Sequence, residues 1–265
     1  YPTFADLSAN AVGLKAGIDY LRPYKGFTAI RMRLSDASSQ YHSLQVFLSK
    51  RRGDVNFTVS YTLSKSMDNG SGNGDNAEFN DLNYNYGPSD HDRRHVVVGT
   101  WTYRIPFLRN SRTVQGYVLG GWEISGIARF QTGAPLTVTG TQVIGRRADY
   151  LGGDMYVAGA PVVDAATGVV SYVNPAAFAI APADRLGNST RGMVRGPSYS
   201  NLDLSLRKQI PIKRTVRAQF YADFFNVFNQ VNYQNPGVNL SSAGFGLITS
   251  AAPSRNVQLG LRVSF

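Results

Sequence analysis

The sequence contains no cysteine, which excludes disulfide bonds and thiolate metal sites within these 265 residues. That composition suits an oxidising compartment, where a free thiol would be a liability. The sequence also lacks any run close to the roughly 18 consecutive apolar residues of a membrane-spanning helix, which excludes a helical membrane protein. Charged residues are few, at 17%. A transmembrane β-barrel remains compatible with these absences, because half of its strand residues face a polar lumen.

The charge is strongly positive, with 27 Lys and Arg against 17 Asp and Glu, a formal net charge of +10. Such an excess can indicate nucleic-acid binding or an anionic surface. Nucleic-acid binders usually concentrate their basic residues on one face or in one run. Here the basic residues are scattered, and the largest clusters are 50–52, 93–94 and 146–147. The sequence therefore predicts no nucleic-acid partner.

Apolar and polar residues alternate in several segments, which is typical of β-strands with one apolar face. The clearest is 256–265, where every second residue is apolar. In 215–226 the opposite face carries Arg217 and Asp223, which is too charged for an ordinary sandwich core. Seven strands are predicted, over 41–51, 55–65, 95–106, 116–130, 200–210, 215–226 and 256–265.

The predicted connections alternate in length. Short links lie near 51–54, 106–115 and 211–214, and long Gly/Asn/Ser-rich loops lie near 66–94, 132–200 and 227–254. This alternation is typical of outer-membrane barrels, with short periplasmic turns and long external loops. If Phe265 ends on the periplasmic side, residues 1–40 form another external loop, with a partial strand near 27–34. The first ten residues show no targeting signal, as expected of a mature or partial chain.

The predicted fold is all-β, an antiparallel up-and-down transmembrane β-barrel whose strands occupy 41–265. A soluble β-sandwich would show the same alternation in any one strand, but loops beyond about 15 residues are uncommon in compact domains. Seven strands cannot close a barrel, because the smallest need about eight. We therefore expect the C-terminal part of a larger barrel, with 256–265 at one open edge and 41–51 or 27–34 at the other. Trp101, Tyr103 and Trp122 are candidates for an interfacial aromatic girdle.

The alternation predicts which side chains face lipid and which face the lumen. Leu202, Leu204, Leu206, Val257, Leu259 and Leu261 are expected to face hydrocarbon. The candidates for the lumen are charged: Glu123, Arg129, Asp203, Arg207, Arg217, Asp223 and Arg262. These seven either pair with one another and stiffen the wall or line a path for a solute.

Acidic residues in the first long loop raise the question of a calcium site. Asp68, Asp75 and Glu78 stand among glycines and asparagines, and carboxylate oxygens are ligands that calcium prefers. The spacing fits no complete calcium motif, so a solvated loop is favoured. No metal site is predicted beyond this weak calcium candidate.

The segment GPSDHDRRH leads into the strand at His95 and holds two histidines four residues apart. On a strand this spacing separates the two imidazoles too widely for one metal ion. The favoured interpretation is a strand-start motif in which Asp90 or Asp92 pairs with Arg93 or Arg94.

Catalytic signatures are missing from the sequence. There are three histidines, no cysteine nucleophile, and no serine in a GxSxG or SxxK context. The sequence therefore predicts neither an enzyme nor a cofactor. Loop aromatics such as Phe79, Tyr84, Tyr86 and Tyr150 either stack on a sugar or peptide solute or pack the loops together.

Ordered blocks from about residue 41 to 265 resemble the C-terminal part of an Oar-like TonB-dependent outer-membrane receptor. The blocks are YHSLQVFLSKR, SYTLSKSMD, GPSDHDRRH, GGWEISGIARFQTGAPLTV, NPAAFA, RGP, NLDLSLRKQ and FYADFFNVFNQVNY. The terminal Phe265, after alternating apolar residues, resembles the signal that the barrel-assembly machinery reads.

The resemblance implies a barrel of usually 22 strands in the outer membrane of a Gram-negative-type bacterium, in contact with membrane lipid. It also implies a plug domain and a TonB box upstream, and energy-coupled uptake of a solute. The partners expected are the missing plug and N-terminal barrel half, the TonB system and the barrel-assembly machinery. The alternative is a structural or binding module, in which a receptor-derived sheet takes part in a surface or multi-chain assembly without transport.

Overall fold

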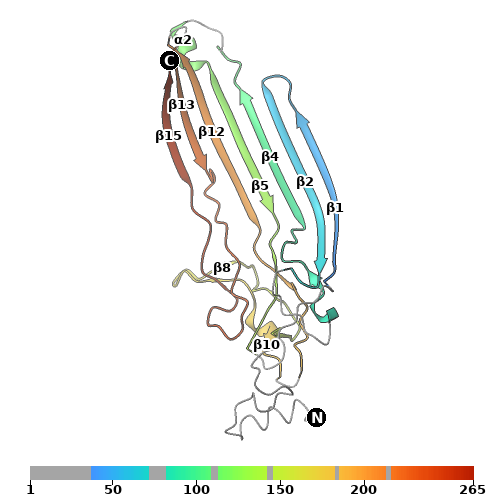
Figure 1. Ribbon diagram of the computed structural model, residues 1–265. Coiled ribbons are helices and arrows are strands. Elements are labelled where there is room, and N and C mark those ends of the chain that lie inside the picture. Colours follow the sequence, from blue (N-terminus) through green and yellow to red (C-terminus); the bar gives the residue numbers. More distant parts are fainter. Residues whose placement is uncertain (1–36, 72–81, 109–112, 142–145, 183–184, 213–215) are drawn as a thin grey trace, which may run out of the picture.

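The computed structural model describes residues 37–71, 82–108, 113–141, 146–182, 185–212 and 216–265. Within these residues, seven long strands form one antiparallel sheet in the order β1-β2-β4-β5-β12-β13-β15. Each long strand pairs with the next long strand along the chain, which is an up-and-down topology (Figure 1). The partial strand expected near 27–34, and most of the loop expected over 1–40, lie outside the described residues.

The long strands are β1 (Ser39–Lys50), β2 (Val55–Asp68), β4 (His95–Arg104), β5 (Trp122–Gln131), β12 (Tyr199–Pro211), β13 (Arg217–Phe225) and β15 (Asn256–Ser264). A short strand, β3 (Gly87–Pro88), pairs with the end of β2. The seven predicted strands thus correspond one to one with the long strands observed. The largest extension is at the end of β2, which continues three residues beyond the predicted Lys65 because Ser39 to Tyr41 of β1 pair with it there.

One part of a predicted strand is wrong. Residues 116–121 do not belong to a strand, because helix α2 (Val114–Leu119) precedes β5. Thr113 caps this helix by accepting a hydrogen bond from the Gly116 N–H at 3.2 Å. Gly121 then turns the chain with φ at +75°, a left-handed conformation that favours glycine. A short apolar run is compatible with either a helix or a strand. The pattern therefore wrongly predicted a strand over 116–121.

The register gives the sheet two chemically different faces. Residues directly opposite each other on neighbouring strands share a face, and successive residues alternate between faces. Leu204, for example, lies opposite Phe224, and Phe224 lies opposite Val257. The apolar face carries Leu44, Val46, Leu48, Phe57, Val59, Val97, Trp101, Ile124, Leu202, Leu204, Leu206, Phe220, Phe224, Val257, Leu259 and Leu261. Many of these side chains are exposed, Leu259 to 69% and Leu261 to 68%.

Glycine and aromatic residues are paired across the strands on both faces. On the apolar face, Trp101 lies opposite Gly126, and a Cβ on that glycine would collide with the indole ring. On the other face, Tyr221 covers Gly260 in the same way. The missing side chains leave room for the rings, so each aromatic residue packs flat against the neighbouring strand.

The two ends of the sheet differ. The short connections, α2 and the C-terminus lie at one end, and the three long connections gather at the other (Figure 1). We call the described parts of 69–94, 132–198 and 226–255 the loop assembly. We find no helix among the described residues with the length and apolar character needed to cross a membrane.

The loop assembly has a hydrophobic core of its own, formed by Val138, Ala148, Val173, Ala177, Phe178, Val194 and Phe245. Short strand pairs organise it: β6 (Pro135–Leu136) with β11 (Val194–Arg195), β7 (Asp149–Tyr150) with β10 (Phe178–Ala179), and β9 (Val170–Ser171) between β8 (Val162–Val163) and β14 (Leu247–Ile248). Two 3-10 turns complete it, η2 (Leu82–Asn85) and η3 (Pro175–Ala177). These long connections are therefore folded structure and not only solvated loops.

The two faces generate a test by site-directed spin labelling. The sequence has no cysteine, so single cysteines introduced at Leu259, Leu261 or Arg262 give unique attachment sites in this chain. In lipid vesicles, labels at 259 and 261 should be relaxed by oxygen, which concentrates in hydrocarbon. A label at 262 should be relaxed by a water-soluble nickel complex. Equal access of the nickel complex to all three positions would contradict the assignment of the faces.

Candidate functional site

All seven charged residues predicted to share the lumen side lie on the polar face of the sheet. Glu123 and Arg129 come from β5, Asp203 and Arg207 from β12, Arg217 and Asp223 from β13, and Arg262 from β15. Their neighbours on this face are mostly serine, threonine, asparagine and glutamine, such as Thr100, Ser125, Asn201, Gln219 and Gln258. The polar face is therefore able to hydrogen-bond water or a polar solute.

Ion pairing across this face is limited. Arg104 of β4 donates from Nε to Glu123 Oε2 at 3.2 Å. Asp223 accepts a hydrogen bond from Ser205 Oγ at 2.5 Å, and Asp203 accepts from Asn201 Nδ2 and from the Asn226 N–H. The mutual pairing of charges that was one of the two expectations thus fails for these two aspartates, whose partners within the described residues are neutral. The register explains this, because Asp203 lies opposite Ile127 and Asp223 opposite Ser205.

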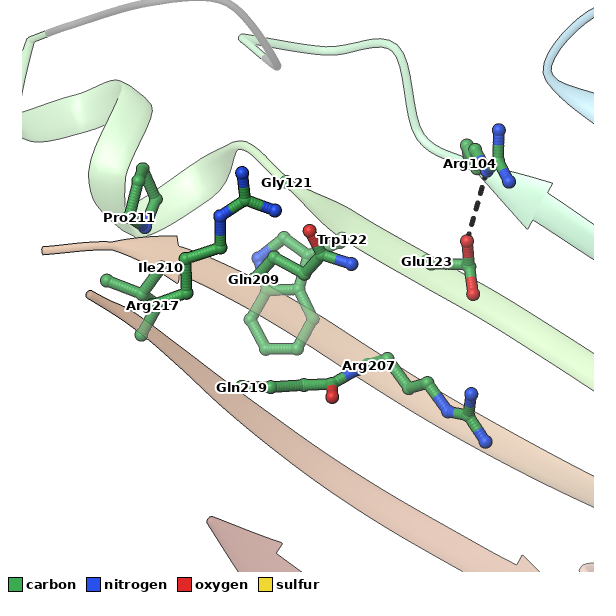
Figure 2. Close-up of a pocket in the computed structure, with 10 residues that line it drawn as sticks. All are labelled: Arg104, Gly121, Trp122, Glu123, Arg207, Gln209, Ile210, Pro211, Arg217 and Gln219. Carbon is green, nitrogen blue, oxygen red and sulfur yellow. Dashed lines mark hydrogen bonds and ion pairs between the residues drawn. The ribbon is translucent and has the colours of Figure 1, made fainter. Parts of the chain in front are cut away.

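A cavity of about 450 Å³ lies on the polar face at the end with the short connections (Figure 2). Its lining residues are Arg104, Gly121, Trp122, Glu123, Arg207, Gln209, Ile210, Pro211, Arg217 and Gln219. They come from the end of β4, the start of β5, the end of β12 and the start of β13. The cavity is lined by three guanidinium groups and two primary amides but by a single carboxylate.

The strand-start motif has different partners from those predicted. Asp92 is buried and pairs with Arg195 Nη2 at 2.5 Å, and Asp90 lies 3.4 Å from Arg191 Nη2. Arg93 donates to the backbone carbonyls of Asp90 and Asp92. The predicted pairing of these aspartates with Arg93 or Arg94 is wrong for the described contacts. The reason is the direction of the Asp92 side chain, which points toward Arg195 and also accepts the Ser66 N–H of β2.

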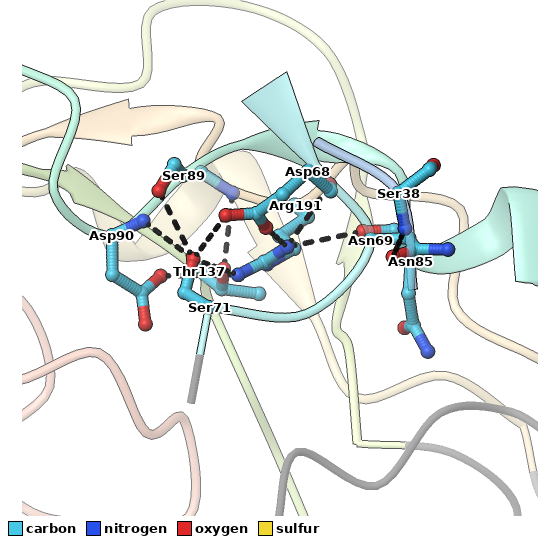
Figure 3. A network of polar contacts seen from close by, with 10 residues as sticks. Ser38, Asp68, Asn69, Ser71, Asn85, Ser89, Asp90, Thr137 and Arg191 are labelled. Carbon is cyan, nitrogen blue, oxygen red and sulfur yellow. Dashed lines mark hydrogen bonds and ion pairs between the residues drawn. The ribbon is translucent and has the colours of Figure 1, made fainter. Parts of the chain in front are cut away.

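Arg191 is the centre of a buried polar network that joins β2 to the loop assembly (Figure 3). Its Nη1 donates to Asp68 Oδ1 at 2.5 Å and to the Asp68 carbonyl at 3.1 Å, and its Nη2 donates to Ser71 Oγ at 2.7 Å. The side chains of Arg191 and Asp68 are only 10% and 9% exposed. Because both ions are withdrawn from water, removing either would leave an unpaired buried charge.

A third pair holds β7 against a neighbouring loop. Arg185 donates hydrogen bonds from both terminal nitrogens to the Asp149 carboxylate, at 2.9 and 2.5 Å. The Asn188 N–H donates to the same carboxylate. The Arg185 hydrogen bonds hold the pKa of Asp149 below its usual range, against the opposing effect of burial. Burial next to Tyr156 raises the pKa of Tyr172 to about 12. Near neutral pH the Asp149 carboxyl is therefore ionised and the Tyr172 hydroxyl is protonated.

The calcium candidate is reduced to one described residue. Asp68 is engaged by Arg191 and Ser71, whereas Asp75 and Glu78 lie outside the described residues. Over the described ranges, no group of three or more histidine, aspartate and glutamate side chains has the geometry to hold a metal ion. His95 Nδ1 is hydrogen-bonded to the Tyr61 hydroxyl at 2.9 Å.

The loop aromatics that the structure describes pack the loop assembly. The Tyr84 ring lies 3.3 Å from the Arg147 guanidinium carbon, and its hydroxyl donates to the Gly187 carbonyl. Tyr150 packs on Phe178 with ring centroids 5.6 Å apart. Tyr86 is more exposed and lies near Gln40 of β1, and Phe79 is outside the described residues.

Four basic residues that no sequence pattern singled out stabilise the two ends of the sheet, three at the loop end and one at the other. Arg185, Arg191 and Arg195 fall within a segment predicted only as a long loop. At the other end, Lys208 lies on the apolar face, where its Nζ donates to the Val118 and Gly120 carbonyls at 2.8 and 2.7 Å. In the sequence, Lys208 stands where the alternation of β12 calls for an apolar residue, and this exception could have marked it. The Lys208 side chain links the carboxyl end of α2 to the sheet.

Replacing Arg191 with methionine tests the buried network. Arg191→Met keeps an unbranched apolar side chain but removes the guanidinium and leaves Asp68 charged and without its cation, which should cost about 3 kcal/mol locally. We expect faster hydrogen exchange in 82–94 and 185–198, measured by mass spectrometry, with little change in β12 or β13. The matched control is Arg146→Met, at an exposed arginine of the same assembly. Identical exchange in both variants would show that the network does not hold the loops.

The comparisons with known proteins agree with this architecture. An outer membrane beta barrel domain matches residues 5–258, which is nearly the whole chain and includes β1 to β13 completely. No curated protein and no solved structure matches the chain.

Proposed function

This chain belongs to the outer membrane beta barrel domain family and lies in the outer membrane, and from this premise we propose that it is the C-terminal barrel part of a TonB-dependent, Oar-like receptor. In this proposal the receptor binds a solute outside the cell and takes it up by energy-coupled transport. The chain's own share is the wall of the lumen and part of the external binding surface.

The division of the sheet into two faces is the observation that carries the proposal. The apolar face has the composition that lipid requires, and the face with Arg207, Arg217, Asp203 and Asp223 has the composition of an aqueous lumen. The loop assembly gathers at the end of the sheet opposite the short turns, as external loops of such barrels do (Figure 1). The ordered sequence blocks that resemble Oar-like receptors supply the finer assignment.

The remaining barrel strands are expected to come from outside these 265 residues. β1 and β15 are the two edge strands of the described sheet. In hydrocarbon each unpaired backbone amide or carbonyl costs several kcal/mol, so both edges need partners there. We propose that the N-terminal barrel half covers both edges and that a plug domain fills the lumen. The TonB system would then act on the plug, from parts of the receptor upstream of this chain.

The proposed role needs no chemical change in the solute. The loop assembly would bind the solute, the plug would move under energy supplied through TonB, and the polar face would provide hydrogen bonds along the path. We therefore propose a transport protein without enzymatic activity or cofactor. The alternative is a structural module, in which the same sheet contributes to a surface assembly and no solute crosses.

Ion conductance of the full-length protein in planar lipid bilayers separates these functions. A large barrel conducts ions unless something fills its lumen. We expect the receptor to be closed in potassium chloride alone and to open reversibly in concentrated urea. The physical reason is that urea unfolds a globular plug, while the barrel's backbone hydrogen bonds are protected by lipid.

The other outcomes of this measurement each reject the proposal. Steady conductance before urea would indicate a passive channel without a plug. Absence of conductance both before and during urea would favour the structural module. A variant without the upstream plug region is the control, and it should conduct from the start.

Insertion into the outer membrane provides a separate test of the expected assembly signal. Phe265 follows β15 and is almost fully exposed, so it contributes little to packing within this chain. Phe265→Ala should nevertheless lower the level of the protein in the outer membrane several-fold, because the assembly machinery would no longer recognise the last strand. The matched control is Phe228→Ala, at an exposed phenylalanine of the loop assembly. Equal membrane levels of both variants would exclude Phe265 as the signal.

A further inference from the structure

The cavity on the polar face holds more positive charge than its surroundings balance. Arg207 and Arg217 line it from adjacent strands, and Arg262 of β15 lies directly opposite Gln219, one of the lining residues. Its one lining carboxylate, Glu123, is already paired with Arg104. The cluster around the cavity therefore contains four arginines and one glutamate.

The hydrogen-bonding capacity of these arginines is largely unused by the described residues. Arg207 donates from Nε to Ser205 Oγ at 3.3 Å, which leaves its two terminal nitrogens for other groups. The guanidinium groups of Arg217 and Arg262 have no hydrogen-bond or ion-pair partner in the part of the chain that the structure describes. Asp203 and Asp223 are bonded to neutral groups and do not compensate them.

The cavity has the size and lining of a small-molecule site. At about 450 Å³ it falls within the usual range of ligand pockets, roughly 300–1,000 Å³. Gln209 and Gln219 add amide donors and acceptors, and Pro211 adds an apolar contact (Figure 2). The Trp122 side chain lies on the opposite face of the sheet, beside Lys208. Guanidinium groups bind carboxylate and phosphate oxygens in bidentate geometry, which suits an oxyanion better than a halide.

We propose that this cavity binds an oxyanion, the carboxylate or phosphate group of a solute, with Arg207 and Arg217 as its principal contacts. The inference deepens the proposed function and rests on it, since it assumes that the polar face lines the lumen. The cavity lies at the end opposite the loop assembly, so it would be a second site that the solute meets after leaving the external loops.

Calorimetric titration of the full-length protein in detergent tests the proposal, with citrate and inorganic phosphate as the probes. Both should bind, and the lower dissociation constant identifies which oxyanion the site prefers. The double variant Arg207→Gln, Arg217→Gln should bind the preferred probe at least about tenfold more weakly, because it removes two charge-assisted contacts. The matched control is Arg51→Gln, Arg52→Gln, which removes equal charge from the exposed β1–β2 turn at the same end of the sheet.

A measurement on the wild-type protein keeps the test decisive if the double variant does not fold. Phenylglyoxal modifies accessible arginines, and mass spectrometry reports the extent at each one. Citrate or phosphate should protect Arg207 and Arg217 but leave Arg51 and Arg52 unchanged.

Three results would overturn the oxyanion site: no binding of either probe, equal weakening in the two double variants, or no selective protection of Arg207 and Arg217. Failure of the site is distinguishable from failure of the proposed function. A receptor that opens only in urea but binds neither probe would keep the transport proposal and reject the anion site. A constitutively open channel that binds phosphate at Arg207 would do the reverse.

Discussion

Backbone pairing between consecutive antiparallel strands is the constraint on which the remaining structure depends. It satisfies the amides and carbonyls that lipid cannot, and its register decides which side chains share a face. A shift of one residue between β13 and β15 would move Leu259 and Leu261 to the side of Arg217 and bring Arg262 into hydrocarbon. The same register sets Glu123 beside Arg104 and leaves Asp223 beside Ser205. Lipid exposure, lumen chemistry and the few ion pairs therefore have one common origin.

The loop end obeys a different balance of forces. Its core of small and aromatic side chains is modest. One buried arginine–aspartate pair connects it to β2, and another joins its segment before β4 to its segment before β12. The free energy lost when such ions leave water offsets much of their electrostatic attraction. These pairs therefore add little net stability compared with an apolar contact. Their main effect is to fix the relative positions of the segments they join. The two terminal nitrogens of Arg191 reach their partners only when Asp68 and Ser71 stand in the observed positions.

The sequence was sufficient for the strands and the alternation of loop lengths, because a period of two survives without knowledge of any partner strand. It also indicated that Arg207, Arg217 and Arg262 share a side, which follows from parity within each strand and order along the chain. It was insufficient for the partners of Asp90 and Asp92, since their ion pairs join residues about a hundred positions away. It also failed at α2, where a glycine pair ends a helix within an apolar run.

The separation of contacts along the chain has a consequence for the order of folding. Each long strand needs only the next one to pair, so the sheet can grow hairpin by hairpin as the chain becomes available. The Asp68–Arg191 and Asp92–Arg195 contacts span 123 and 103 residues, so each closes a longer loop than any pairing between neighbouring strands of the sheet. Contacts of such long range are slow because loop closure precedes any gain. We therefore expect the loop assembly to acquire its final shape after neighbouring strands of the sheet have paired.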